Sequence, residues 1–184
     1  MSFILTIDVA PPDMILVESL YKCLTRKAWE SVRQLALQKC QFRCSLCGVD
    51  EKGLNCHEVW TFSTESEARK LIEVLPLCKM CHAVRHMDRP RFQELMGFES
   101  MKEHFMKVNK CSVEDFNEYY QQHQEKAESL VSLGTDHMIA WKTDYNEYIS
   151  IVVQPGNLKR GYEWKNGYLM YDMSKKFNRH LKEK

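Results

Sequence analysis

The sequence predicts an α+β protein whose centre is a small zinc-stapled module, with flanking helices and a small C-terminal β-rich segment. Three observations predict this class. Two Cys-x2-Cys pairs lie about 30 residues apart, and two such thiolate turns close one tetrahedral zinc site. Stretches of helical periodicity flank the pairs. The chain after Tyr145 returns to a β-forming composition.

Composition and charge set the broad class. Of the 184 residues, 28% are charged and 44% are hydrophobic, which is ordinary for a globular protein. The formal net charge is +1, so any attraction to nucleic acid must come from a local patch. We read no signal peptide at the N-terminus, where Asp8 interrupts a short apolar run, and no membrane span. An intracellular, cytoplasmic setting is therefore expected, in which paired cysteines more often hold metal than form disulfides.

The N-terminal part is expected to contain a strand and two helices. Ser2–Val9 is rich in β-formers and is followed by two prolines, which predicts a short strand. Met14–Leu24 has leucines on one helical face. Thr25 is suited to cap a second helix. The inner side of that helix carries Trp29, Val32 and Ala36.

The module itself is expected to combine a strand with helices. Leu54–Phe62 alternates as a strand does. Thr64 and Glu67 form a capping-box pattern, which predicts that a helix follows and that Pro76 ends it. Cys81–Met87 is expected to open another helix. The first of these helices would bury Ala68, Leu71, Ile72 and Leu75 on one face.

The C-terminal half is expected to be helical and then β-rich. Ser112 and Asp115 predict the start of a long helix. Its aromatic stripe is either a packed core or a partner surface. Tyr148–Val153 and Tyr168–Tyr171 read as strands, the latter after an Asn-Gly turn. The expected division is 1–25 for the N-terminal strand and helix, 26–92 for the zinc module, and 93–184 for the helical and β-rich region.

The zinc ligands are predicted from spacing and chemistry. Thiolates at Cys-x2-Cys spacing present two sulfurs to one ion without strain. Cys40 lies close enough to the first pair to substitute for one ligand, whereas Cys23 and Cys111 read as ordinary cysteines. Because such binding energy is folding energy, the metal-free module is expected to be largely unfolded. The predicted ligands are Cys44, Cys47, Cys78 and Cys81.

Histidines around the knuckles form a second motif. The chain reads Leu54-Asn-Cys-His57 and then Leu77-Cys-x2-Cys-His82-x3-His86. Together with the first knuckle, this pattern resembles the HNH nucleases of the zinc-knuckle type. Further segments, Trp29–Arg33, His57–Trp60, Phe105–Asn109 and Trp141–Asp144, resemble one bacterial and phage group of these proteins, and the similarity covers roughly residues 15–148. The resemblance implies a treble-clef, or ββα-metal, core. It also implies metal-dependent hydrolysis of DNA phosphodiester bonds.

The resemblance also implies roles for the histidines. His57 would be the general base that takes a proton from water. His82, with His86, would hold a second divalent ion (Mg²⁺, Mn²⁺, Ni²⁺ or Zn²⁺) that stabilises charge on the phosphate. Structural alternatives stay open for all three, because a buried strand histidine or a residue beside zinc would show the same pattern.

The chain departs from the family pattern at two positions. The residue before the base is commonly Asp or His, and here it is Cys56, whose thiolate prefers softer ions. The asparagine that orients the base in the family is replaced by Glu73, which either orients His57, ligates metal or marks an impaired site. Glu58 shares a face with Cys56 on a regular strand, so it is a candidate oxygen ligand.

Basic residues gather around the second knuckle. They offer a local positive patch for phosphate contacts, although a solvated basic face would look the same. The candidate DNA-binding residues are Lys79, Arg85, Arg89 and Arg91.

Two functions follow from these patterns. One is an HNH-type DNA endonuclease. The alternative is a catalytically impaired HNH-derived zinc module that binds nucleic acid, or a protein partner through its C-terminal region.

Overall fold

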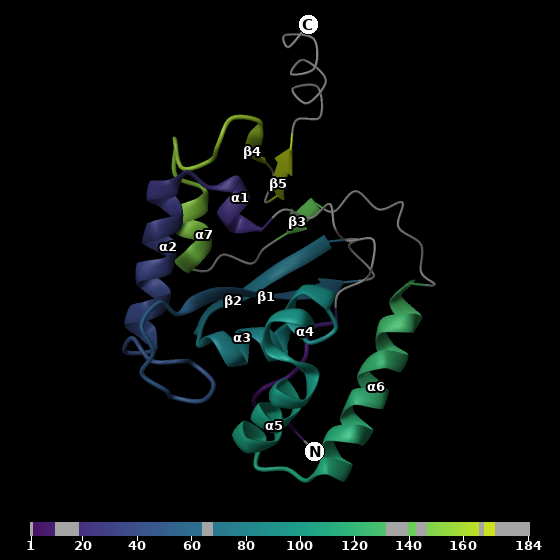
Figure 1. The fold of residues 1–184 in the computed structure, drawn as a ribbon. Helices are drawn as coiled ribbons and strands as arrows, with labels where there is room; N and C mark the ends of the chain where they lie inside the picture. The colour runs from purple at the N-terminus through teal and green to yellow at the C-terminus, as the bar shows by residue number, and fades with distance from the viewer. Residues whose placement is uncertain are drawn as a thin grey trace, which may run out of the picture. The chain divides into compact units, whose positions relative to one another are not determined.

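The structure, a computed structural model, describes residues 2–9, 19–63, 68–131, 140–142, 147–165 and 168–171. It is a mixed α+β protein, as predicted, with a sheet of strand order β1-β2-β3-β5-β4 (Figure 1). Across these described residues, every helix is too short or too polar to cross a bilayer. The chain forms two compact units, each assembled from separated stretches. Unit 1 comprises Met1–Leu16, Ala36–His57 and Leu75–Asp136, and unit 2 comprises Val17–Leu35, Glu58–Val74 and His137–Lys184. The predicted division at residues 25 and 92 stays a prediction.

Unit 1 is built around four helices. These are α3 (Lys79–Arg85), α4 (Pro90–Met96), α5 (Phe98–Asn109) and α6 (Val113–Val131). Phe105 and Phe116 are buried with their rings 5.1 Å apart, so the aromatic stripe of α6 packs into a core. The predicted cap of α6 is confirmed, since the Asp115 amide donates to Ser112 Oγ over 3.1 Å.

The N-terminal segment of unit 1 is not a strand, so that prediction is wrong for residues 2–9. Its backbone bonds to side chains and, at Asp8, to the Arg85 carbonyl of α3, instead of to a neighbouring strand. The amides of Ile4 and Leu5 donate to Asn109 Oδ1, each over 2.9 Å, and the Ile7 amide donates to the Tyr119 hydroxyl over 2.8 Å. Satisfied in this way, the extended segment has no need of a β ladder.

Unit 2 contains most of the sheet. Its elements are α1 (Leu20–Cys23), most of α2 (Arg26–Lys39), β3 (Ala140–Lys142), α7 (Glu147–Val152), β4 (Tyr162–Lys165) and β5 (Tyr168–Tyr171). The predicted cap of α2 is confirmed, because the Ala28 amide lies 3.4 Å from Thr25 Oγ1. The predicted strand over Tyr168–Tyr171 is confirmed as β5, which pairs antiparallel with β4, whereas the predicted Asn-Gly turn lies outside the described residues. The predicted helix over Met14–Leu24 is reduced to α1 among the described residues, since 10–18 lie outside them.

The strands β1 (Asn55–Ser63) and β2 (Ala68–Leu77) run through both units. β1 confirms the predicted strand, but β2 replaces the helix that was predicted for its residues. In β2 the buried residues include Leu71, Val74 and Leu77, and successive side chains of a strand point to opposite faces. Burial on both faces of this strand therefore mimics the three-residue spacing of a helix.

The opposite error occurs at α7. We predicted a strand over Tyr148–Val153, and the structure places a helix at Glu147–Val152. Tyr148, Ile149 and Val152 are buried there, which is the spacing of one helical face. Packing of this face outweighs the β-forming preference of isoleucine and valine.

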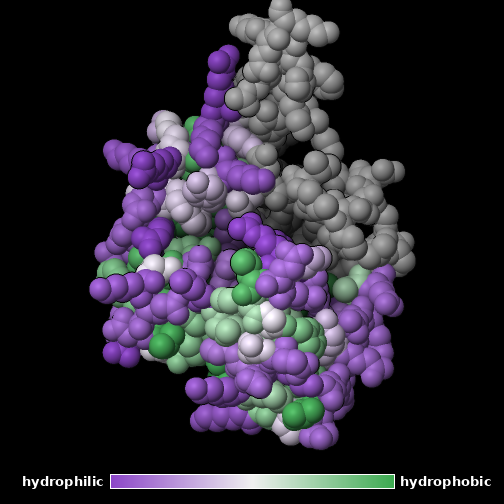
Figure 2. Space-filling view, in the orientation of Figure 1, coloured by the Kyte–Doolittle hydropathy of each residue, from purple (hydrophilic) through white to green (hydrophobic). Residues whose placement is uncertain are grey.

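The visible face of the molecule is mainly hydrophilic, with smaller hydrophobic groups between (Figure 2). Large exposed hydrophobic residues are dispersed through the described chain, as is normal for a globular surface. They are Ile4, Tyr21, Phe42, Val49, Ile72, Leu95 and Val113.

Candidate metal centre and histidine cluster

The two knuckles bring four cysteine sulfurs together. The Sγ atoms of Cys44, Cys47, Cys78 and Cys81 all lie within 4.8 Å of one another. In the first knuckle, the Gly48 amide donates to the Cys44 carbonyl over 2.9 Å, and Gly48 has a φ of +72°, as expected for this turn. In the second, Cys78 is the N-cap residue of α3, and its Sγ accepts from the Cys81 amide over 3.4 Å. The predicted convergence is confirmed.

The electrostatics of the sulfurs suit a cation. A hydrogen bond from Cys81 lowers the pKa of Cys44 to about 4, whereas burial raises the pKa of Cys78 to about 11. Four soft ligands, of which Cys44, Cys78 and Cys81 are buried and Cys47 is partly buried, form the donor set of a structural zinc site, and zinc would hold all four as thiolates.

The remaining cysteines near the knuckles lie outside this group. Cys40 Sγ donates to the Leu37 carbonyl over 3.3 Å. His104 Nε2 lies 3.1 Å from Cys81 Sγ, and His104 is not part of the group that converges. It is a hydrogen-bonding neighbour of one sulfur, of the kind that commonly surrounds zinc thiolates.

Next to the sulfurs, three histidines form the second cluster. His57 comes from β1, His82 lies within α3, and His86 is the C-cap residue of α3. Their ligand nitrogens all lie within 4.8 Å of one another. The ring of His57 is 5.5 Å from that of His82 and 4.8 Å from that of His86, centroid to centroid. The Phe92 ring stacks on His86 at 5.0 Å.

Burial keeps two of these imidazoles neutral. Burial, and after it the nearby His57 ring, lower the pKa of His82 to about 4 and that of His86 to about 2. Neutral imidazole is the form that ligates metal. The buried Nδ1 of His86 has no hydrogen-bond partner among the described residues, and a buried polar atom of this kind needs an explanation. A metal ion bound by the cluster would supply one.

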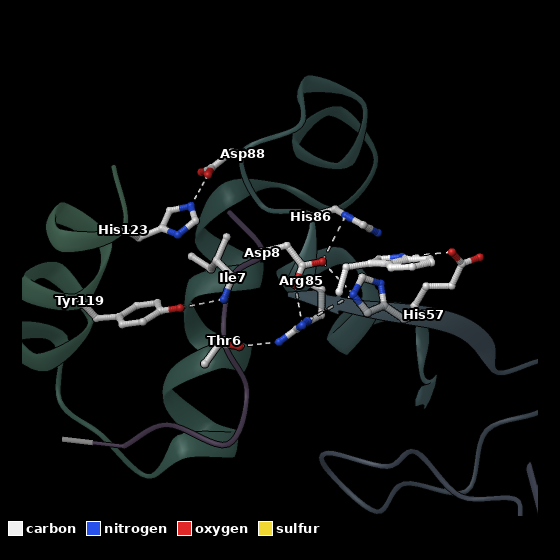
Figure 3. Close-up of polar contacts among 11 residues, drawn as sticks. Thr6, Ile7, Asp8, His57, Arg85, His86, Asp88, Tyr119 and His123 are labelled. Carbon is white, nitrogen blue, oxygen red and sulfur yellow. Dashed lines mark hydrogen bonds and ion pairs between the residues drawn. The ribbon is translucent and has the colours of Figure 1, made fainter. Parts of the chain in front are cut away.

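The structure adds a residue that the sequence did not indicate. Asp8, from the N-terminal segment, places Oδ2 2.7 Å from His57 Nε2 and Oδ1 2.5 Å from Arg85 Nη2 (Figure 3). Arg85 Nε lies 3.4 Å from the same His57 nitrogen. One nitrogen cannot donate and accept at once, and the shorter contact to a carboxylate indicates that Nε2–H donates to Asp8. The only signal in the sequence was an acid inside an apolar run.

Three other candidates of the sequence are not part of the group formed by the three converging imidazoles. Cys56 and Glu58 are not in the group of converging ligands. The Glu58 carboxylate accepts from the Leu20 amide over 2.9 Å and from the Trp60 indole over 3.1 Å. Glu73 lies in β2. In the described part of the chain, the carboxylate that contacts His57 is that of Asp8.

The basic patch divides into one buried and three exposed residues. Arg85 is only 8% exposed, and its guanidinium also donates to the Thr6 hydroxyl. It is therefore an internal ion-pair partner of Asp8. Three of the predicted DNA-binding residues are exposed to solvent and could contact a phosphate: Lys79, Arg89 and Arg91.

Comparisons with protein-family models, with curated proteins and with solved structures found no match for this chain. The case for a function therefore rests on the geometry of the two clusters.

Proposed function

We propose that this chain is a metal-dependent nuclease of the HNH type that hydrolyses phosphodiester bonds in DNA. One arrangement carries the proposal. A strand-borne histidine, His57, faces two histidines of a helix whose first turn belongs to the cysteine cluster. In the resembling family, this is where the general base and the metal ligands lie.

The order of elements supports a treble-clef core. The first knuckle leads into β1, β1 leads into β2, and β2 ends at the second knuckle, where α3 begins. The Ser45 amide donates to the Pro76 carbonyl over 2.9 Å, which ties the first knuckle to the end of β2. A knuckle, two strands and a helix in this order are what a ββα-metal core requires, so the order supports the proposal.

Each polar side chain then has a role in hydrolysis. His57 Nε2–H donates to Asp8, so Nδ1 keeps the lone pair that can take a proton from water. Asp8 fixes this tautomer and stabilises the imidazolium that forms. His82 and His86 would hold the ion, which supplies positive charge to stabilise the developing charge on the phosphate.

The surface charge supports a phosphate-bearing substrate. Lys79 lies at the start of α3, and Arg89 and Arg91 at the start of α4, all three exposed. The charges of Asp8 and Arg85 cancel each other, so a divalent ion would leave the site with excess positive charge. Backbone phosphates meet such charge without any reading of base sequence.

One observation favours the second candidate, a catalytically impaired module that binds a partner. His57 is only 4% exposed, whereas a general base must reach water. If this burial persists when the protein meets nucleic acid, the histidine cluster is a structural metal site and the exposed basic residues serve binding alone.

Plasmid cleavage separates the two. Zinc-loaded protein is incubated with supercoiled plasmid and Mg²⁺, Mn²⁺, Ni²⁺ or Zn²⁺, alongside H57A and H123A. The control is matched, because His123 is also buried and also bonded to an aspartate, Asp88, outside the cluster. The nuclease predicts cleavage that H57A loses and H123A keeps. No cleavage with any ion, together with DNA binding that H57A retains, overturns the nuclease and supports the binding module.

A further inference from the structure

We propose that Asp8 is an oxygen ligand of the second metal ion, so that the N-terminal segment completes a site of mixed imidazole and carboxylate ligands. This inference deepens the proposed function and rests on it for its purpose. The metal site can be tested without any cleavage.

The first argument is chemical. Imidazoles alone suit zinc, nickel and copper, whereas Mg²⁺ and Mn²⁺ require carboxylate oxygen. The residue before His57 is Cys56, which supplies no oxygen, and both Glu58 oxygens accept hydrogen bonds from other groups. Asp8 is the carboxylate that the fold brings to the imidazoles (Figure 3).

The second argument is geometric. Asp8 Oδ2 lies 4.0 Å from the Nδ1 atom of His86, which is buried and has no hydrogen-bond partner among the described residues. This separation is too long for a hydrogen bond. Two metal–ligand bonds of about 2.1 Å each span up to about 4.2 Å, so one ion can be shared by this oxygen and this nitrogen.

The third argument is the way in which Asp8 is held. The Asp8 amide donates to the Arg85 carbonyl over 2.9 Å, and Arg85 binds the other carboxylate oxygen. Upstream, Asn109 of α5 and Tyr119 of α6 bind the backbone of the segment. Three helices therefore fix the position of one carboxylate, which is the preorganisation that a ligand requires. Oδ2 has a second lone pair beyond the bond from His57, so it can orient that ring and bind an ion together.

Metal binding by the zinc-loaded full chain tests the proposal. Mn²⁺, Ni²⁺ and further Zn²⁺ are titrated separately into wild type, D8N and D8C, with Mn²⁺ followed by electron paramagnetic resonance and Ni²⁺ and Zn²⁺ by calorimetry. D88N is the matched control, since Asp88 is also bonded to a buried histidine, His123, outside the cluster. Zinc content and circular dichroism establish that each variant is folded.

The expected result is one Mn²⁺ per wild-type chain beyond the structural zinc. D8N weakens this binding by roughly 10- to 100-fold, while Ni²⁺, which prefers imidazole, loses less. D8C also loses Mn²⁺ but gains affinity for a second Zn²⁺, because a thiolate favours the softer ion. D88N binds as wild type does.

A purely structural role for Asp8 predicts otherwise. In that case D8N and D8C weaken both ions equally, or neither, and the proposal is overturned. If wild type binds no second ion at all, it is overturned as well. The outcomes are distinct from those of the cleavage assay: Asp8-dependent Mn²⁺ binding without cleavage rejects the nuclease alone, and cleavage with Asp8-independent binding rejects this inference alone.

Discussion

Replacing Arg85 by alanine is expected to destabilise unit 1 rather than only to weaken DNA binding. Arg85 is 8% exposed and contacts Asp8, His57 and Thr6. Its removal leaves Asp8 Oδ1 and the Thr6 hydroxyl without this donor, and the carboxylate keeps its contact with His57. An uncompensated buried charge of this kind costs a large share of a domain's stability.

The magnitude follows from the burial of the pair. Removing one member of a buried ion pair costs about 3–5 kcal/mol. The Asp8 side chain is 25% exposed, so water compensates part of the loss, and we expect about 3 kcal/mol. For a chain of this length, that corresponds to a fall in Tm of roughly 6–12 °C.

The assay compares R85A with R89A by urea and thermal unfolding at one fixed free zinc concentration, because bound metal shifts the apparent stability. Arg89 is exposed, so R89A is expected to unfold within about 0.5 kcal/mol of wild type. If it contacts a phosphate, R89A also lowers the slope of log affinity against log salt by about 0.9. An R85A protein as stable as R89A, with the same loss of DNA affinity, would refute the internal role of Arg85.

Three further outcomes are expected. Removal of zinc by a chelator, or the substitution C78A, is expected to unfold unit 1, which is measured as a loss of circular dichroism signal and of one zinc equivalent in elemental analysis. The substitution C111S changes neither quantity, and a C78A protein that is folded without zinc would contradict the prediction. F105A lowers the free energy of unfolding by about 3–5 kcal/mol, because its ring is fully buried against Phe3, Phe116 and Tyr119, whereas the exposed Phe42 tolerates alanine within about 0.5 kcal/mol. Acid destabilises the zinc-loaded chain between pH 6.5 and about 4. In the unfolded chain His82 and His86 bind protons with a pKa near 6.5, whereas in the folded chain their pKa values are about 4 and about 2. As the pH falls through this window the unfolded state binds more protons than the folded state, so the free energy of unfolding decreases. H86Q reduces the slope of unfolding free energy against pH in this window, and an unchanged slope would contradict the assignment.

The features that could be predicted from the sequence depend on residues that lie close together in the chain. The cysteine knuckles, the pair of histidines four residues apart and the cap at Ser112 depend on local spacing, and the structure reproduces each. Chain order alone also places His57 near α3 once β1 is recognised.

What was missed depends on contacts between distant segments. The residues of β2 were predicted to form a helix because buried side chains occur on both faces of the strand. Which segments of the chain pack against those faces cannot be predicted from the local sequence. Asp8 lies 49 positions before His57 and reaches it only because Asn109, Tyr119 and Arg85 hold the segment, as no local pattern indicates.

The second knuckle and the first turn of α3 are the same residues, since Cys78 is the N-cap of α3 and Cys81 directly precedes His82. If the chain binds both proposed ions, this shared turn would impose an order on their binding. Without an ion to hold the four sulfurs together, the first turn of α3 would not be fixed and its imidazoles would not be positioned for a second ion. Zinc limitation in a cell would then lower occupancy of the second site, whatever the concentration of the second ion.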